Sequence, residues 1–246
     1  MTTQRPLAGQ TGVALLLVLW ALALLSLLLG GLAGWVQLET RQGLWQRQHT
    51  QAVLAAEAGM NQAVQILLDV SYRPRWIADG REVPLQFDDA QLVVAVTSER
   101  GKLDLNAAMV EDVTRVAQAC GASRDQATQL GKALQARRGG NAPPLRVVEE
   151  LRQLPGMTQR LYDRLLPHVT LWSGLPQPEA AFATPLLRRA LNMPNQAAVG
   201  TEPGDVVTID SQAQLPSGFS ARLQTTVLLN PSEGNAQPYR VLRWQE

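Results

Sequence analysis

The sequence contains very few of the side chains that most often carry out chemistry in enzymes. It has one cysteine and two histidines among 246 residues. The single cysteine, Cys120, excludes an intramolecular disulfide and leaves the redox compartment open. His49 and His168 are far apart, and the sequence has no Cys/His metal spacing, no nucleophile elbow and no phosphate-binding loop. We therefore expect neither catalysis nor a cofactor.

The chain also lacks an excess of charge of either sign. Its 22 lysine and arginine residues and 21 aspartate and glutamate residues give a formal net charge of +1. A protein that binds nucleic acid usually carries a basic surface that neutralises phosphates. We therefore expect no nucleic-acid partner.

Charge is missing altogether from one long stretch near the N-terminus. Residues 13–36 are mostly Leu, Ala, Val, Gly and Trp, and no charged residue lies between Arg5 and Glu39. A helix of this length spans roughly the 30 Å hydrocarbon core of a bilayer. The sequence therefore predicts one transmembrane anchor. The single positive charge before the anchor favours a cytoplasmic N-terminus, with the rest of the chain on the other side.

Residues 37–70 continue the helical pattern. No proline occurs between Pro6 and Pro74, and apolar residues recur at spacings of three, four and seven. These residues are Leu38, Trp45, Ala52, Ala56, Met60, Ala63 and Leu67. We expect the helix to form a spine together with the anchor and to pack on a domain.

Strand patterns lie on both sides of a stretch of helical patterns. Residues 91–97 predict a strand that follows the turn-rich residues 72–84, and the alternation in residues 102–106 predicts its hairpin partner. The strands expected beyond the helical stretch are 205–209, 219–229 and 239–244.

The helical stretch divides into several short helices. Asn106 is placed to cap the first helix, and Ser123 precedes the second. The helices expected are 110–120, 126–134, a pair within 147–172 and a short one at 185–191 inside a connection over 173–204. This order predicts an α+β fold in which sheet portions 71–105 and 205–246 flank a helical insertion at 106–172.

The start of the chain resembles a type IV prepilin leader over residues 1–12. In that family a peptidase cuts after a glycine that precedes the apolar run and methylates the new N-terminus. By resemblance the cut lies between Gly12 and Val13, and Val13 is methylated. The family nearly always has glutamate at the fifth residue after the cut, whereas this chain has Leu17. The K-type minor pseudopilins of type II secretion are similar to prepilins and also lack this glutamate.

Two further strings are similar to K-type pseudopilins. The first resembles the family string E-x-G-K-I-N-L-N-x-A, and the second resembles a helical hairpin of the same family. The matching residues are Gly101, Lys102, Leu105, Asn106 and Ala108 in the first string, and Glu150, Leu151, Gly156, Tyr162, Leu165 and Pro167 in the second. The chain therefore resembles the family of type II secretion system protein K, the general secretion pathway protein K.

The resemblance implies a fold and a role. It implies a transmembrane spine helix packed on a pilin-like antiparallel sheet, which a helix-hairpin-helix or SAM-like insertion interrupts. The role is that of a non-enzymatic subunit at the pseudopilus tip, which supports pseudopilus assembly and the export of folded proteins across the outer membrane. The implied location is the bacterial inner membrane, crossed once, with a periplasmic C-terminal domain. The implied partners are the I- and J-type minor pseudopilins, the major pseudopilin, the prepilin peptidase and the inner-membrane assembly platform.

Family members carry a calcium site in the helical insertion. The matching place in this chain, residues 133–140, is basic and contains Arg137 and Arg138. A calcium ion needs several oxygen ligands, usually including carboxylates. We therefore expect no metal here.

Two other functions stay open on the sequence. One is a minor pilin of a type IV pilus or a DNA-uptake system. The other is a membrane-anchored DNA-binding protein, because the turn at residues 154–156 resembles a helix-hairpin-helix loop. Phosphate binding by that loop normally uses a second glycine, where this chain has Thr158, and Asp163 accompanies the arginines of the next helix.

Overall fold

The computed structural model describes residues 11–69, 76–140, 143–229 and 238–246, with the backbone alone at 11–14, 32–34 and 36–38. The chain forms two compact units, Met1–Gln51 and Ala52–Glu246. The first helix, α1 (Thr11–Leu68), contributes to both units. Residues 1–10 of the expected leader lie outside the described residues.

The described part of the first unit is helical and exposes large apolar side chains. Leu16, Trp20, Leu24 and Leu28 are all more than half exposed. Within the described residues, no helix is long and apolar enough to cross a membrane. The anchor expected over 13–36 stays a prediction.

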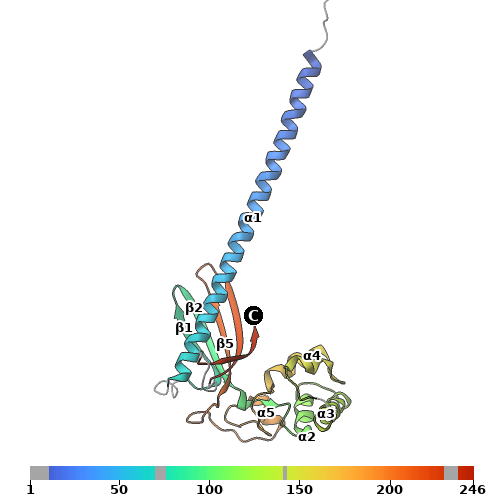
Figure 1. The fold of residues 1–246 in the computed structure, drawn as a ribbon, viewed down its shortest axis with the longest axis vertical. Helices are drawn as coiled ribbons and strands as arrows, with labels where there is room; N and C mark the ends of the chain where they lie inside the picture. Colours follow the sequence, from blue (N-terminus) through green and yellow to red (C-terminus); the bar gives the residue numbers. More distant parts are fainter. Residues whose placement is uncertain (1–10, 70–75, 141–142, 230–237) are drawn as a thin grey trace, which may run out of the picture. The chain divides into compact units, whose positions relative to one another are not determined.

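In the second unit, α1 packs against a sheet through small side chains. Ala52, Ala56 and Ala63 are fully buried, and their spacing places them on one face of the helix. A Cβ atom on Gly59 would overlap the Ser211 hydroxyl and come within 3.2 Å of Val94. Small residues therefore let the helix approach the sheet closely (Figure 1).

The sheet is antiparallel and has the order β1-β2-β5-β6-β7 among the described strands. Leu92, Val94 and Val96 of β2 alternate with more exposed residues and join the core that includes α1. Alternation arises because successive side chains of a strand point to opposite faces. The strands are β1 (Asp79–Phe87), β2 (Ala90–Ser98), β5 (Val206–Gln214), β6 (Ser220–Leu228) and β7 (Arg240–Gln245).

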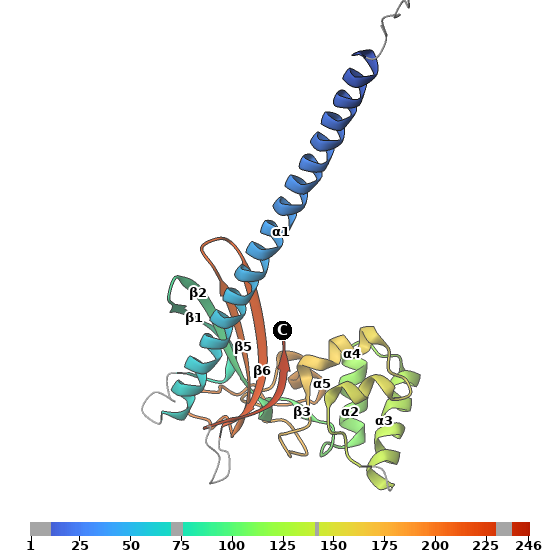
Figure 2. The ribbon, with the colours of Figure 1, turned by 45° about the horizontal axis from the view of Figure 1, so that its top comes forward.

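Between β2 and β5, residues 110–190 form a group of short helices around a second core. We call residues 110–190 the helical segment. Figure 2 shows α2 to α5 grouped together. Leu130, Leu151, Tyr162 and Leu187 are among its fully buried side chains. Its helices are α2 (Val110–Ala119), α3 (Arg124–Gly139), η3 (Val148–Gln153), α4 (Gln159–Leu165), η4 (Leu166–His168) and α5 (Pro185–Ala190).

Two short strands connect the chain before α2 to the stretch between η4 and α5. β3 (Leu103–Asp104) pairs in parallel with β4 (Val169–Thr170), after the turn η2 (Glu99–Gly101). The expected hairpin over 91–106 is therefore wrong, because β2 pairs with β1 instead. The mixed α+β class is confirmed by the helices and the antiparallel sheet.

Candidate functional site

The junction between the sheet and the helical segment gathers the residues of the first family-like string. The string begins in η2, directly after β2, and continues through β3 toward α2. The parallel pairing of β3 with β4 brings its residues beside those between η4 and α5. The junction is therefore the candidate site, as the place where the two cores of the second unit are connected.

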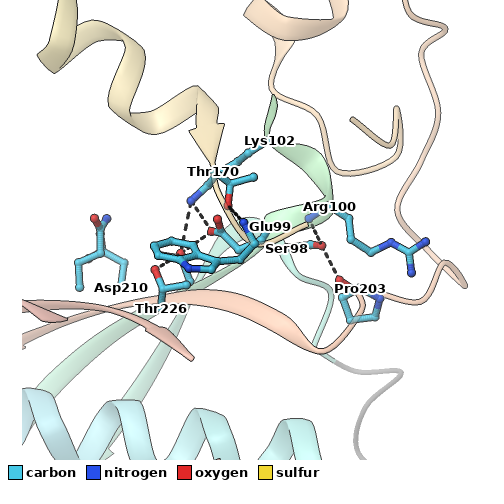
Figure 3. A network of polar contacts seen from close by, with 11 residues as sticks. Ser98, Glu99, Arg100, Lys102, Thr170, Pro203, Asp210 and Thr226 are labelled. Carbon is cyan, nitrogen blue, oxygen red and sulfur yellow. Dashed lines mark hydrogen bonds and ion pairs between the residues drawn. The ribbon is translucent and has the colours of Figure 1, made fainter. Parts of the chain in front are cut away.

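A buried carboxylate organises the sheet side of the junction. Glu99 is 1% exposed, and its Oε1 lies 2.5 Å from the ammonium of Lys102. The Thr208 hydroxyl donates to the same oxygen at 2.6 Å and lies 2.9 Å from the Thr226 hydroxyl. Figure 3 shows Glu99, Lys102 and Thr226 close to one another. The pair thus connects η2 to β5 and β6. Removing one member of such a buried pair leaves an uncompensated charge.

The backbone of η2 approaches the residues before α5 very closely. A Cβ atom on Gly101 would overlap the Phe182 carbonyl. Glu179 donates its backbone N–H to the Arg100 carbonyl at 2.8 Å, and the two side chains form an ion pair. Only glycine fits this approach without movement of the backbone, which gives a physical reason for Gly101 in the string.

The remaining residues of the string hold loops together. Asp104 accepts hydrogen bonds from the backbone of Asn106 and Gly174, both at 2.8 Å. The Asn106 amide donates to the Leu145 carbonyl at 2.9 Å and accepts from the Leu145 N–H at 3.0 Å. The expectation that Asn106 caps a helix is wrong, because the cap position of α2 is Met109 and the Asn106 amide pairs with a distant loop. Leu105 and Ala108 are buried in the second core.

The second family-like string lies inside the helical segment. Leu151, Tyr162 and Leu165 are buried in the second core, and Pro167 lies in η4. The guanidinium of Arg152 covers the Tyr162 ring, 4.3 Å from its centroid. Burial raises the pKa of the Tyr162 hydroxyl, and the nearby Glu149 carboxylate raises it further.

The glycine loop of the hairpin is packed against a neighbouring helix. Gly156 has a positive φ of 85°, and a Cβ atom there would overlap the Gln126 carbonyl of α3. Gly121, in the loop between α2 and α3, is similarly close to the guanidinium of Arg164 on α4. Because these two positions have no Cβ atom, the loop at Gly156 can approach α3 and the loop at Gly121 can approach α4.

A cleft of about 790 Å³ borders the junction. Its polar lining includes Thr208, Asp210 and Thr226 from the sheet, beside Glu99 and Lys102. The Asp210 carboxylate accepts from the guanidinium of Arg222, with Nε 2.9 Å from Oδ1. No histidine or cysteine lines the described cleft, and the described residues include no cluster of three His, Cys, Asp or Glu side chains that could hold a metal.

Cys120 and His168 are both placed in packing roles. Burial raises the pKa of the Cys120 thiol, which is the opposite of what a reactive thiol needs. Burial lowers the pKa of His168, and the positive charge of Lys102 adds to this effect. The Nδ1 atom of His168 lies 3.0 Å from the hydroxyl of Thr184, the residue that caps α5.

The proposed processing site lies at the edge of the described chain. Gly12 and Val13 are in the first turns of α1, and their side chains lie outside the described residues. Leu17 is described and is 64% exposed. The processing of Gly12 and Val13 stays a prediction.

Sequence reasoning missed several contacts of the junction and the helical segment. Arg243 on β7 forms an ion pair with Glu149 at 2.7 Å, which joins the last strand to η3. Arg138 donates to the carbonyl groups of Leu105 and Ala108. Only the basic character of residues 137–138 pointed to the second contact, and nothing local pointed to the first.

Comparison with known proteins finds a solved structure with a similar fold. No protein-family model and no curated protein matches the chain. The solved structure is a chain of the crystal structure of the GspK–GspI–GspJ complex from the type 2 secretion system of enterotoxigenic Escherichia coli. The match has a TM-score of 0.55 at 13% identity and covers 81% of this chain and 97% of that chain. The protein therefore shares the fold of a chain in this complex.

Proposed function

We propose that the protein is a non-enzymatic minor pseudopilin of the K type, at the tip of the pseudopilus of a bacterial type II secretion system. The observation that carries the proposal is the similarity of its fold to a chain of the GspK–GspI–GspJ complex. The two family-like strings support it, because their residues hold the junction and the helical segment together.

In this proposal the N-terminal helix anchors the protein in the inner membrane. The support is the exposed apolar surface of residues 15–31 together with the uncharged sequence of 13–36. A continuous apolar surface of this kind marks contact with lipid or with another apolar surface. The N-terminus is cytoplasmic, and residues from about 37 onward are periplasmic.

The same proposal assigns partners and a position in the filament. The I- and J-type minor pseudopilins join this protein at the tip, the major pseudopilin lies below, and the assembly platform adds subunits from the inner membrane. A glutamate near the start of a pilin helix would pair with the N-terminal amine of a neighbouring subunit. Leu17 offers no such carboxylate, which fits a subunit at the end of the filament.

Intact mass tests whether the protein belongs to the prepilin class. The full chain is expressed with and without a prepilin peptidase, extracted from membranes and weighed. We expect the peptidase to remove residues 1–12 and to add one methyl group at Val13. An uncut chain beside a control prepilin that is fully cut would contradict the proposal and leave an ordinary membrane-anchored protein as the better account.

A further inference from the structure

Oxygen atoms from residues 105–108 and from residues 143–150 converge on two adjacent arginines. Arg138, in the last turn of α3, donates from Nε to the Leu105 carbonyl at 3.2 Å. Its two terminal nitrogens donate to the carbonyl groups of Leu105 and Ala108. One guanidinium therefore binds both carbonyls at the point where the chain enters the helical segment.

The second arginine holds the other stretch. Arg137 donates from Nε to the Pro143 carbonyl at 3.0 Å and forms an ion pair with Glu150. The other oxygen of Glu150 accepts the backbone N–H groups of Arg146 and Val147, at 2.8 and 3.2 Å. The described loop after α3 is thus organised around the Arg137–Glu150 pair.

The two stretches are also bonded to each other. In the sequence, Asn106 lies between Leu105 and Ala108, whose carbonyl groups Arg138 binds. Its side-chain amide donates to the Leu145 carbonyl and accepts a hydrogen bond from the Leu145 N–H. Burial lowers the pKa of the Arg138 guanidinium, and the negative charge of Asp104 opposes this shift. An arginine nevertheless stays charged at any physiological pH, so a permanent positive charge faces these oxygens.

Carbonyl and carboxylate oxygens are also the groups that bind a calcium ion. The resemblance to K-type pseudopilins implies such an ion in this part of the chain, but the residues do not fit it. The matching stretch, 133–140, contributes two guanidinium groups and no carboxylate, and the Glu150 carboxylate is already paired with Arg137. A divalent cation at the same oxygens would be repelled by both arginines.

We propose that Arg137 and Arg138 perform the structural role of a bound divalent cation in this protein, so that the helical segment folds and stays folded without metal. Arg138 fixes residues 105–108, and Arg137 fixes residues 143–150. The inference concerns residues 105–150, and its comparison with a calcium ion rests on the same resemblance to K-type pseudopilins as the proposed function.

Thermal unfolding of the full chain in detergent tests the inference. The wild-type protein is measured alone, with EDTA and with an excess of calcium chloride, and its Tm stays the same in all three. Arg138→Met keeps the length of the side chain but removes its charge and hydrogen bonds, and we expect it to lower Tm by about 5 °C. Calcium does not restore the loss. Arg160→Met is the matched control, because Arg160 is an exposed arginine on α4 of the same segment, and its Tm stays at the wild-type value.

A second variant covers the case in which Arg138→Met does not fold. Arg138→Lys keeps a charge but replaces the planar group that reaches two carbonyls with a single ammonium, so its Tm lies below that of wild type. A wild-type Tm that falls with EDTA and recovers with calcium would overturn the inference. It would also be overturned if Arg138→Met and Arg138→Lys both unfolded at the same temperature as Arg160→Met.

Discussion

At the scale of single residues, the junction depends on side chains whose size or charge leaves little choice. Gly101 has the Phe182 carbonyl where a Cβ atom would be, and Glu99 keeps a carboxylate away from water beside one ammonium. The role of Gly101 follows from its contact with Phe182, more than 70 positions away, and Glu99 also accepts a hydrogen bond from Thr208, 109 positions away. They explain in physical terms why a short string after β2 contains glycine and lysine at these positions.

Replacing Gly101 by alanine tests the close approach. We expect Gly101→Ala to lower the free energy of unfolding by about 2 kcal/mol, because the methyl group overlaps a backbone carbonyl that cannot rotate away. Denaturant unfolding of the full chain in detergent measures the loss. Gly139→Ala is the control and should be near neutral, because a Cβ atom there meets nothing within 4 Å. Gly174→Ala would be a poor control, because Gly174 has a positive φ. Equal stability of Gly101→Ala and Gly139→Ala would contradict the contact.

Replacing Lys102 tests the buried ion pair. Lys102→Met leaves the Glu99 carboxylate without its cation, and we expect a loss of about 3 kcal/mol in the free energy of unfolding. The double variant Glu99→Gln/Lys102→Met should lose less, because no charge is then buried. Denaturant unfolding measures the stability of both the single and the double variant. A double variant that is less stable than Lys102→Met would show that the pair itself, rather than the unpaired charge, dominates.

At the scale of elements, the sequence predicted the strands whose pattern is local. β2, β5, β6 and β7 carry β-branched or alternating residues, and each is close to a range expected from the sequence. β1 was missed because Gly80 and Pro84 are turn signals. A proline is tolerated in β1 because the strand lies at the sheet edge, where one missing N–H breaks no ladder bond.

The elements of the junction could not be predicted in the same way. Polar and apolar residues do alternate around Leu103, but they form the two-residue strand β3, which pairs in parallel with β4. The paired residues are 66 positions apart in the sequence. The amide of Asn106 likewise prefers a backbone partner 39 positions away over the nearby helix. Local patterns carry no information on such partners, so the composition of the candidate site was predictable and its geometry was not.

Acidification tests the contact between η4 and α5. The folded structure lowers the pKa of His168, through burial and through Lys102, so the folded protein binds a proton less readily than the unfolded chain. The contribution of neutral His168 to the free energy of unfolding is therefore complete above the ordinary histidine pKa near 6.5, and it is lost as the pH falls below that value. We expect Tm to fall between pH 7.5 and 5.5, and His168→Asn to reduce that fall. An identical pH dependence of the wild type and the variant would contradict this role of His168.

At the scale of the whole molecule, the account rests on a shared fold and on features of the N-terminal helix. The fold alone does not distinguish a tip subunit from other pseudopilins, so the proposed position in the filament rests on Leu17 and on the bulk of the helical segment. Added bulk of this kind would obstruct a further subunit above it.

Introducing the missing carboxylate tests the terminal position. In a strain that lacks the native gene, the Leu17→Glu variant should support no more protein secretion than the wild-type protein does, because a tip subunit needs no partner for that charge. Leu17→Gln controls for polarity without charge. Secretion that rises above the wild-type level with Leu17→Glu alone would mean that the protein behaves as an inner subunit of the filament.

The most direct test of the central claim is whether the protein assembles with minor pseudopilins. The full chain is co-expressed with the I- and J-type minor pseudopilins of the same bacterium, extracted in mild detergent, purified through this chain and weighed by native mass spectrometry. The account predicts one complex that contains a single copy of each of the three proteins, and no comparable complex with the minor pilins of a type IV pilus. Recovery of this chain alone, while the other two proteins are present and folded, would contradict the account.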